Sequence, residues 1–230
     1  MITVGNGMLA KAFRNRKMKA DVILFASGVS NSLENEISEF ERERLLLKDV
    51  LSTLENKTIV YFSTCSIYDD SVNNNAYVKH KLLMENLIKK SGNNYLICRV
   101  SNVVGGNGNQ NTIFNFFMNK IRDQEIFEVW KNAERNLIDI DDVVFIVSKI
   151  IEKGIINRVL NIANRKNYQI TDIIEKMETF TGKIAIHKLL DKGCPLNIDV
   201  SYLEGNIKEY VALFDVNYLN KLLNKYYTNE

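Results

Sequence analysis

The 230-residue sequence has few of the residues that build metal sites and cross-links. It contains one proline, three cysteines and two histidines. A zinc or iron centre would need both histidines together with distant cysteines or carboxylates, so we expect no metal site. The cysteines are odd in number and far apart, which predicts free thiols in a reducing compartment (Cys65, Cys98 and Cys194).

Long apolar runs and an excess of one charge are also missing. No apolar run approaches the roughly 20 residues that a membrane-spanning helix needs, and the first residues lack the basic region of a secretory signal. Lys and Arg number 30 against 28 Asp and Glu, a net charge of +2. The two signs alternate, as between Glu39 and Lys48. We therefore expect a cytoplasmic protein that binds neither nucleic acid nor membranes.

Short apolar runs alternate along the chain with longer amphipathic segments. This order is typical of a mostly parallel α/β sheet. Strands are expected at residues 2–4, 21–26, 58–63 and 95–100, and helices at 36–54 and 77–90. Ligands of such sheets bind beyond the carboxyl ends of the strands, which is where polar clusters fall in this sequence.

The first polar cluster is a glycine-containing turn after the first expected strand. Its sequence, Gly5-Asn6-Gly7-Met8-Leu9-Ala10, has the pattern G-x-G-x-x-A. Glycines there let backbone N–H groups approach a pyrophosphate, and the start of the following helix adds partial positive charge. Such a turn also serves tight packing alone, so by itself it is weak evidence for a dinucleotide site.

The second cluster pairs a tyrosine with a lysine. Tyr77 and Lys81 lie four residues apart on one expected helix, and Thr64 follows the preceding strand. A phenol with a pKa near 10 must shift by about three units to exchange protons near neutrality, and an adjacent ammonium favours the phenolate. A helical Tyr with an exposed Lys also occurs by chance, so the pair gains weight only in its context.

Taken in order, these segments resemble an extended short-chain dehydrogenase/reductase of the NAD-dependent epimerase/dehydratase family, whose members modify nucleotide-sugars. Two later stretches complete the resemblance, which runs from Ile2 to about Lys183: R-V-S-N-V-V-G from Arg99 and R-N-L-I-D-I-D-D-V from Arg135. It implies a Rossmann-like, doubly wound parallel sheet that forms a cofactor domain over residues 1–165. Segments of this domain are interleaved into a small C-terminal substrate lobe over residues 166–230.

The resemblance also implies roles for individual residues. Tyr77 is the catalytic acid or base, Lys81 grips the nicotinamide ribose, and Thr64 holds the substrate carbonyl. The cofactor, NAD or NADP, is expected to contact Gly5, Gly7, Met8, Leu9, Ala26, Ser27, Gly28, Ser63, Tyr77, Lys81 and Ser101. The nucleotide-sugar is expected to contact Thr64, Cys65, Ser66, Asn102 and Arg135. Family members commonly form homodimers through the two helices at 36–54 and 77–90.

Departures from the family pattern narrow the reaction. Family 4,6-dehydratases carry Asp and Glu directly after the catalytic Thr, whereas this chain has Cys65 and Ser66. This favours a 4-keto reductase or a 4-epimerase, in surface-polysaccharide or deoxysugar biosynthesis. The alternative is a non-catalytic descendant that only binds a nucleotide-sugar or a partner protein. The Tyr–Lys pair beside a hydroxyl favours the enzyme, because a pure binding protein has no need of it.

Several residues keep two interpretations. Cys65 is either a proton donor or a small buried filler, and His80 either faces the same cleft as Tyr77 or is structural. Arg135 either binds the pyrophosphate or forms a salt bridge with the aspartates that follow it. Two helix starts are also expected, one capped by Asp141 and Asp142, the other by Thr171 or Asp172 before residues 173–180, stopping at Gly182.

A segment is missing between Ala10 and Asp21. Family members place there a strand that ends in the residue selecting NAD or NADP, followed by a further helix and strand. No ligand of the ribose 2′-hydroxyl can therefore be assigned, and we expect an open adenosine half with weak or unselective cofactor binding. Three cations in this segment either contact phosphate, favouring NADP, or form the solvated face of a short helix: Arg14, Arg16 and Lys17.

Overall fold

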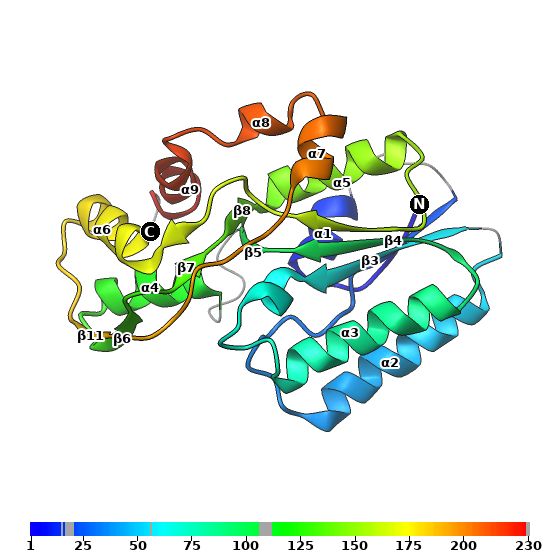
Figure 1. The fold of residues 1–230 in the computed structure, drawn as a ribbon, viewed down its shortest axis with the longest axis horizontal. Helices are drawn as coiled ribbons and strands as arrows, with labels where there is room; N and C mark the ends of the chain where they lie inside the picture. Colours follow the sequence, from blue (N-terminus) through cyan, green and yellow to red (C-terminus); the bar gives the residue numbers. More distant parts are fainter. Residues whose placement is uncertain (15, 17–20, 56, 106–111, 229–230) are drawn as a thin grey trace.

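A five-stranded parallel sheet forms the centre of the protein (Figure 1). The computed structural model describes residues 1–14, 16, 21–55, 57–105 and 112–228. The strands lie in the order β1 (Ile2–Val4), β2 (Val22–Phe25), β3 (Thr58–Thr64), β4 (Asn94–Val100) and β9 (Arg158–Ile162). Every neighbouring pair is parallel. The predicted Rossmann-like sheet is therefore confirmed.

Helices cover both faces of this sheet. On one face lie α2 (Ile37–Ser52) and α3 (Ala76–Lys90), and on the other α1 (Met8–Arg14) and α5 (Ile140–Glu152) (Figure 1). Two apolar clusters fill the space between the sheet and these helices. One includes Leu47, Ile59 and Met84, and the other includes Leu24, Val60 and Val147. Strands buried on both faces explain why their sequences are continuous apolar runs.

The sheet stops at β1. Among the described residues no strand pairs with the outer edge of β1, and the side chain of Ile2 on this strand is exposed. The chain passes from the end of α1 at Arg14 to the start of β2 at Val22. This agrees with the predicted loss of the strands that carry the adenosine site.

A second apolar core lies beside the carboxyl ends of the strands. Figure 1 shows β3 and β4 pointing toward it. Its buried side chains include Phe114, Met118, Ile173, Met177 and Leu222. They come from both sides of residue 165, and the division of the chain into two regions at that residue stays a prediction. The elements around this core are α4 (Ile113–Arg122), β6 (Phe127–Trp130), β7 (Glu134–Arg135), β8 (Leu137–Asp139), β10 (Tyr168–Gln169), α6 (Ile170–Thr181), β11 (His187–Leu190) and α9 (Tyr218–Tyr227).

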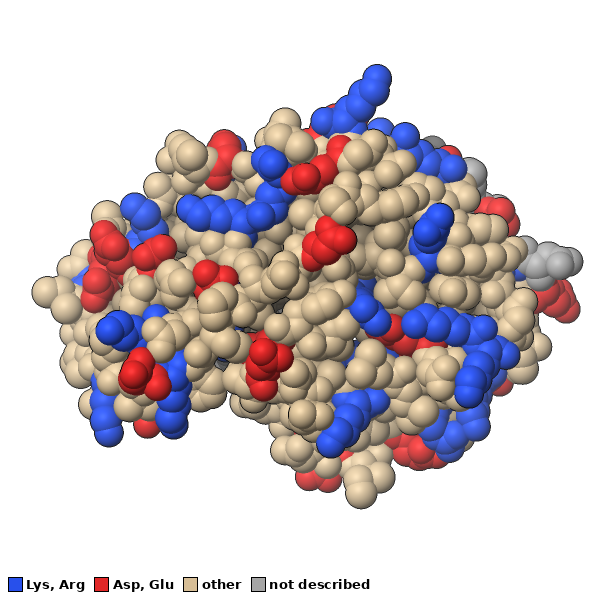
Figure 2. All heavy atoms as spheres, viewed as in Figure 1, with Lys and Arg blue, Asp and Glu red and all other residues tan. Residues whose placement is uncertain are grey.

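Short strand pairs and helices complete the fold. The strand β5 (Asn102–Val104) pairs with β8, β7 with β10, and β6 with β11. The 3-10 helix η1 (Cys65–Tyr68) follows β3, and α7 (Ser201–Asn206) and α8 (Tyr210–Leu213) lead into α9. Figure 2 shows acidic and basic side chains interspersed on one face of the molecule. No helix in the described part of the chain combines the length and the apolarity that crossing a membrane requires.

Both predicted helix caps are wrong in detail. The cap of α5 is Asp139, whose carboxylate accepts the Asp141 N–H at 2.8 Å, while Asp141 and Asp142 lie in the first turn. Helix α6 already begins at Ile170, whose N–H is donated to the Ala133 carbonyl, because the pairing of β10 with β7 leads directly into the helix. The predicted stop at Gly182 is confirmed, with a left-handed φ of 68°.

Candidate active site

Helix α3 carries a line of polar side chains into the protein. It begins after Asn75, whose side chain accepts the Val78 N–H at 2.8 Å. Tyr77, Lys81 and Glu85 follow at intervals of four residues and are all buried. This spacing places them on one face of the helix, which packs against β3.

The structure brings Tyr77 and Thr64 together, as the sequence predicted. Thr64 ends β3, and its hydroxyl lies near enough to the Tyr77 phenol to lower the pKa of that phenol. The same hydroxyl donates to Ser66 Oγ at 2.9 Å and accepts the Ser66 N–H at 3.0 Å. Burial raises the pKa of Tyr77 to about 12, although the nearby Thr64 hydroxyl acts in the opposite direction. The phenol is therefore protonated at neutral pH.

Lys81 does not acidify this phenol, which corrects the sequence-based expectation. Its ammonium lies 5.8 Å from the centroid of the Tyr77 ring. Its hydrogen bonds go to Glu43 Oε1 at 3.1 Å and to the Tyr61 hydroxyl at 3.3 Å. The carboxylate of Glu43 balances the lysine charge, so Tyr77 does not experience an isolated cation.

Sequence reasoning missed Glu43, which lies 38 residues before Lys81. A signal was nevertheless present. On α2, Glu43 stands where the apolar stripe formed by Phe40, Leu47 and Val50 would place a core residue. A carboxylate at such a position needs buried partners.

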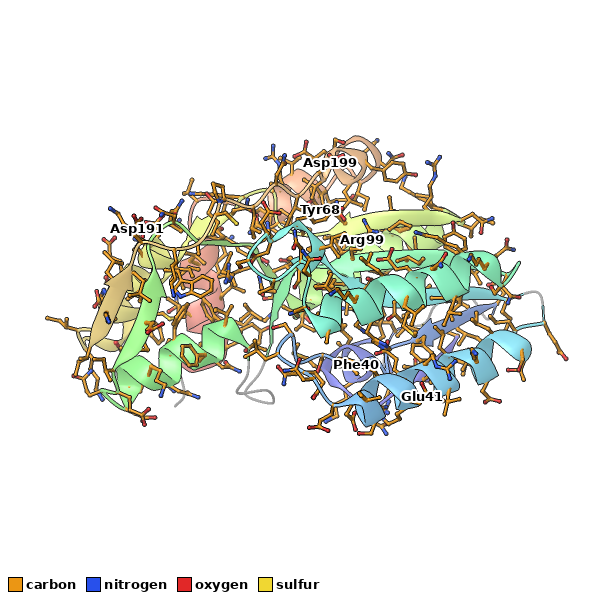
Figure 3. The ribbon with its side chains drawn as sticks, turned by 60° about the horizontal axis from the view of Figure 1, so that its bottom comes forward. Phe40, Glu41, Tyr68, Arg99, Asp191 and Asp199 are labelled. Atoms are coloured by element: carbon orange, nitrogen blue, oxygen red, sulfur yellow. The ribbon has the colours of Figure 1, made fainter. Side chains whose placement is uncertain are left out.

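His80 is structural in this arrangement. Its Nε2 lies 3.0 Å from Glu43 Oε2, and its ring stacks on Phe40 at 4.7 Å between centroids. Phe40 projects from α2 in Figure 3. Of the two interpretations of His80, the contacts favour the structural one.

The two glycines of the turn after β1 have different surroundings. Gly5 has a φ of 121°, and a Cβ there would clash with the backbone of Ala26. At Gly7, apart from its neighbours in the chain, no atom of the described residues lies within 4 Å of where a Cβ would stand. The turn therefore packs against the end of β2 at its first glycine and leaves its second glycine accessible to a ligand.

The cations after the turn differ in their placement. Arg14 folds back over it, donating from Nη2 to the Gly5 carbonyl at 3.0 Å and to Asn6 Oδ1. Arg16 is exposed. Lys17 lies outside the described residues. Arg14 is thus the one of these three that the structure shows at the turn.

The other predicted cofactor residues gather at the same edge of the sheet, with different environments. Met8 and Leu9 start α1 and are half-buried, as are Ala26 and Ser27 after β2. A Cβ on Gly28 would clash with Lys81 Nζ and lie 3.0 Å from Glu43 Oε1.

The two predicted serines are engaged differently. Ser63 donates its hydroxyl to Glu85 at 2.7 Å. The hydroxyl of Ser101 is buried without a hydrogen-bond partner in the described part of the chain. Of the two, Ser101 is the one whose hydroxyl is free to bind a ligand.

Glu85 joins α3 to the end of β4. It accepts two hydrogen bonds from the Arg99 guanidinium, at 2.8 and 2.7 Å. Arg99 also donates to the Tyr68 hydroxyl at 3.2 Å, and Tyr68 donates to Asn161 at 3.0 Å. Figure 3 labels Tyr68 and Arg99 at this junction. A bidentate pair of this kind holds α3 and η1 in register with the sheet.

The predicted substrate residues fall into two groups. Cys65 is buried, its Sγ lies 3.1 Å from the Arg99 carbonyl, and burial raises the pKa of its thiol, so the contacts favour a small filler over a proton donor. Ser66 stays beside Thr64. Asn102 is exposed and donates to the Asn136 carbonyl at 3.1 Å.

Arg135 pairs with an aspartate that the sequence did not suggest. Its Nη1 donates to Asp69 Oδ2 at 3.2 Å, in the loop after η1, and to the Glu134 carbonyl at 2.7 Å. Of the two interpretations of Arg135, the salt bridge with the aspartates that follow it is not found among the described residues. Arg135 also lines a cavity of about 130 Å³, together with Ile113, Phe116, Phe117, Glu128, Trp130 and Ile170.

Comparisons with solved structures find the same fold in proteins of low sequence identity. UDP-glucuronic acid 4-epimerase from Bacillus cereus, in complex with NAD, is 18% identical with a TM-score of 0.71, covering 96% of this chain and 77% of that one. RMD from Pseudomonas aeruginosa, complexed with NADPH, is 15% identical with a TM-score of 0.70, covering 90% and 82%. WbmG from Bordetella bronchiseptica, with NAD and UDP, is 15% identical with a TM-score of 0.69, covering 90% and 72%.

Sequence comparison gives the family. No curated protein matches the chain significantly. The profile of the NAD dependent epimerase/dehydratase family matches residues 6–163, the part that contains most of the glycine turn, Thr64, Tyr77, Lys81 and Arg135. The chain therefore belongs to the NAD dependent epimerase/dehydratase family.

Proposed function

We propose that the chain is an NAD(P)-dependent enzyme that reduces a 4-keto nucleotide-sugar or epimerises its C4, in surface-polysaccharide or deoxysugar biosynthesis. The observation that carries this proposal is the buried pair of Thr64 and Tyr77 at the carboxyl end of β3. Ligands of parallel sheets bind at this edge. The similar structures that contain NAD, NADPH or UDP support the same class of ligand.

The site fits a nicotinamide dinucleotide in two respects. The open space at Gly7 lets backbone N–H groups approach a pyrophosphate. The buried hydroxyl of Ser101 after β4 is available to a ligand. Bound there, the cofactor would supply or accept the hydride.

Tyr77 moves the proton in this proposal. Thr64 holds the oxygen of the reacting sugar carbon, and Tyr77, with a pKa of about 12, is protonated and able to donate to that oxygen as the carbonyl is reduced. Oxidation would need the phenolate. The resting protonation state therefore favours the 4-keto reductase, and the 4-epimerase is the second candidate.

Arg135 is proposed to bind the diphosphate of the substrate. Its Nε and Nη2 make no hydrogen bond to any described residue, so one edge of the guanidinium is free. Such an edge matches two phosphate oxygens. The aromatic faces of Phe116, Phe117 and Trp130 in the adjoining cavity suit a nucleobase.

The test is turnover of a panel of nucleotide-sugars with both nicotinamide cofactors, followed by chromatographic separation and mass spectrometry. We expect a product that differs from its substrate by two hydrogens, or by configuration alone. Tyr77→Phe should abolish turnover and leave folding nearly unchanged, because it removes a proton-transfer group and no apolar volume. Wild-type turnover in this variant would exclude Tyr77 as the acid or base. A protein that binds no cofactor and turns over no substrate would favour the non-catalytic alternative.

We also propose a cytoplasmic homodimer. The cysteines among the described residues are free thiols, as expected in a reducing compartment. Helices α2 and α3 expose Leu45, Leu82 and Leu83 to solvent, and burial of these side chains against a second copy would stabilise a dimer. Light scattering on the purified protein gives the mass that decides this.

A further inference from the structure

Glu43 is the most enclosed carboxylate near the proposed site. Its side chain has no solvent exposure, and both oxygens accept hydrogen bonds. Oε1 accepts from the Tyr61 hydroxyl at 2.7 Å and from Lys81 at 3.1 Å. Oε2 accepts from the Val29 N–H at 2.7 Å and lies 3.0 Å from His80 Nε2.

This carboxylate is ionised at neutral pH. Burial alone would raise its pKa, but Lys81 and the three other partners lower the pKa of Glu43 to about 2. Burial lowers the pKa of Lys81, and Glu43 opposes this effect. The charged form of each residue therefore depends on the other.

Glu43 and Lys81 also lie beside the loop at Gly28, which is predicted to bind the cofactor. Gly28 lies so close to Lys81 and Glu43 that a Cβ would clash with Lys81 Nζ. Lys81 itself is only 2% exposed. The position of its ammonium is thus set on one side by Glu43 and on another by the Gly28 backbone.

We propose that Glu43 is a positioning residue for the reaction: it holds the Lys81 ammonium beside the Gly28 loop and offsets its charge, so that the Tyr77 phenol stays protonated in the resting site. The inference rests on the proposed function. A purely structural role explains it less well, because well-packed apolar side chains fill a space between helices at lower cost than a buried ion pair.

Several charged and titratable groups face this pair and bear on the test. Burial raises the pKa of Tyr77 most, and the charge of Glu43 raises it further. Removing that charge therefore lowers the pKa of Tyr77 whether or not Lys81 keeps its proton. The other groups that act on Tyr77, Lys81 or Glu43 are Arg42 on α2, Tyr61 and Thr64 on β3, Cys65 on η1 and His80 on α3.

The deciding experiment follows Tyr77 directly and needs neither cofactor nor substrate. Protein labelled with 13Cζ-tyrosine is titrated by NMR, with the Tyr77 signal among the ten tyrosines assigned from Tyr77→Phe. In the wild type we expect this signal to move little below about pH 11. In Glu43→Gln we expect its midpoint to lie lower by about one pH unit, a tenfold change in proton affinity.

Two further variants separate positioning from packing. Tyr61→Phe removes one hydrogen bond to Glu43 but keeps the charge pair, so we expect it to lower stability and leave the Tyr77 midpoint in place. In Glu43→Gln, the new side-chain amide would turn an N–H toward at least one of the hydrogen-bond donors that now surround the carboxylate. Two donors that face each other cannot form a hydrogen bond, so this variant is at risk of not folding. Glu43→Asp keeps the negative charge but moves it one methylene farther from its partners. We expect it to lower the Tyr77 midpoint as Glu43→Gln does, but by less.

Three results would overturn the proposal. The first is an unchanged Tyr77 midpoint in folded Glu43→Gln. The second, which applies if Glu43→Gln does not fold, is an unchanged or raised Tyr77 midpoint in Glu43→Asp. The third is a shift of the Tyr77 midpoint in Tyr61→Phe as large as the shift in the Glu43 variant. Because the titration is independent of turnover, a shifted midpoint in a protein without activity would refute the proposed function alone. Where turnover is found, the limb of the kcat/KM profile that reports Tyr77, which is the alkaline limb for reduction, should move with the NMR midpoint.

Discussion

Replacing Arg135 with alanine tests the substrate half of the proposed site. The guanidinium is largely enclosed, with 16% of the side chain exposed. It offers the free edge of Nε and Nη2, while Nη1 is engaged by Asp69 and the Glu134 carbonyl. A hydrogen bond between charged groups contributes about 1.5–3 kcal/mol. Losing about 2 kcal/mol raises the Kd for a diphosphate roughly 30-fold.

Asp69 supplies the matched control. It occupies Nη1 in the ligand-free protein, so it competes with an incoming diphosphate for the same cation. Asp69→Asn keeps the shape of the side chain and removes the competing charge. We expect this variant to bind the diphosphate several-fold more tightly than the wild type, the opposite sign to Arg135→Ala.

Calorimetry with UDP measures both effects without knowledge of the sugar. Thermal unfolding accompanies it, since loss of the ion pair with Asp69 should cost about 1–3 kcal/mol of stability. With a true substrate, Arg135→Ala should raise KM more than it lowers kcat, because the contact is remote from the reacting carbon. Unchanged UDP affinity in a folded Arg135→Ala protein would leave Arg135 as a structural ion-pair partner only.

Three further predictions concern the cofactor turn, the adenosine half and acid stability. Gly5→Ala should destabilise the protein by at least about 2 kcal/mol, because of its φ of 121° and the clash with Ala26, whereas Gly7→Ala should leave the melting temperature nearly unchanged. Titration of NAD, NADP and ADP-ribose by calorimetry should show weak binding with little selectivity for NAD, and tight NAD-selective binding would contradict the open adenosine half. The pKa of Glu43 is lowered from 4.5 to about 2, so its contribution to stability is complete above about pH 4.5 and declines between pH 4.5 and 2. Urea unfolding over this range should show that decline, and a flat profile would contradict the ion pair.

The sheet and its helices were predictable because each leaves a local pattern. β2 and β3 are buried on both faces, so their sequences are continuous apolar runs, and the predicted limits differ from the observed ones by one residue at each end or less. The amphipathic pattern of α2 and α3 identified both helices in the same way. Local spacing also placed Tyr77 and Lys81 on one face, and the structure brings Thr64 beside Tyr77.

What the sequence did not reveal are the contacts between distant segments. Glu43 lies among alternating charges on α2, and its partners come from the loop after β2, from β3 and from α3. Asp69 meets Arg135 across 66 positions in the sequence. Neither the spacing of these residues in the sequence nor their residue type identifies them as partners. Only the apolar stripe through Phe40 and Leu47 indicated that Glu43 is buried.

The structure also explains how a shortened cofactor domain can keep its proposed chemistry. The groups assigned to proton transfer come from β3 and α3, and their supports come from α2, the loop after β2 and the end of β4. None of these elements pairs with the outer edge of β1, where the sheet stops in the described part of the chain. The adenosine half can therefore be lost without moving Thr64 relative to Tyr77, so cofactor affinity and turnover should respond to different sets of mutations. Substitutions of Arg14 at the glycine turn are expected to change the Kd of the cofactor, and substitutions of Glu43 the pH dependence of kcat.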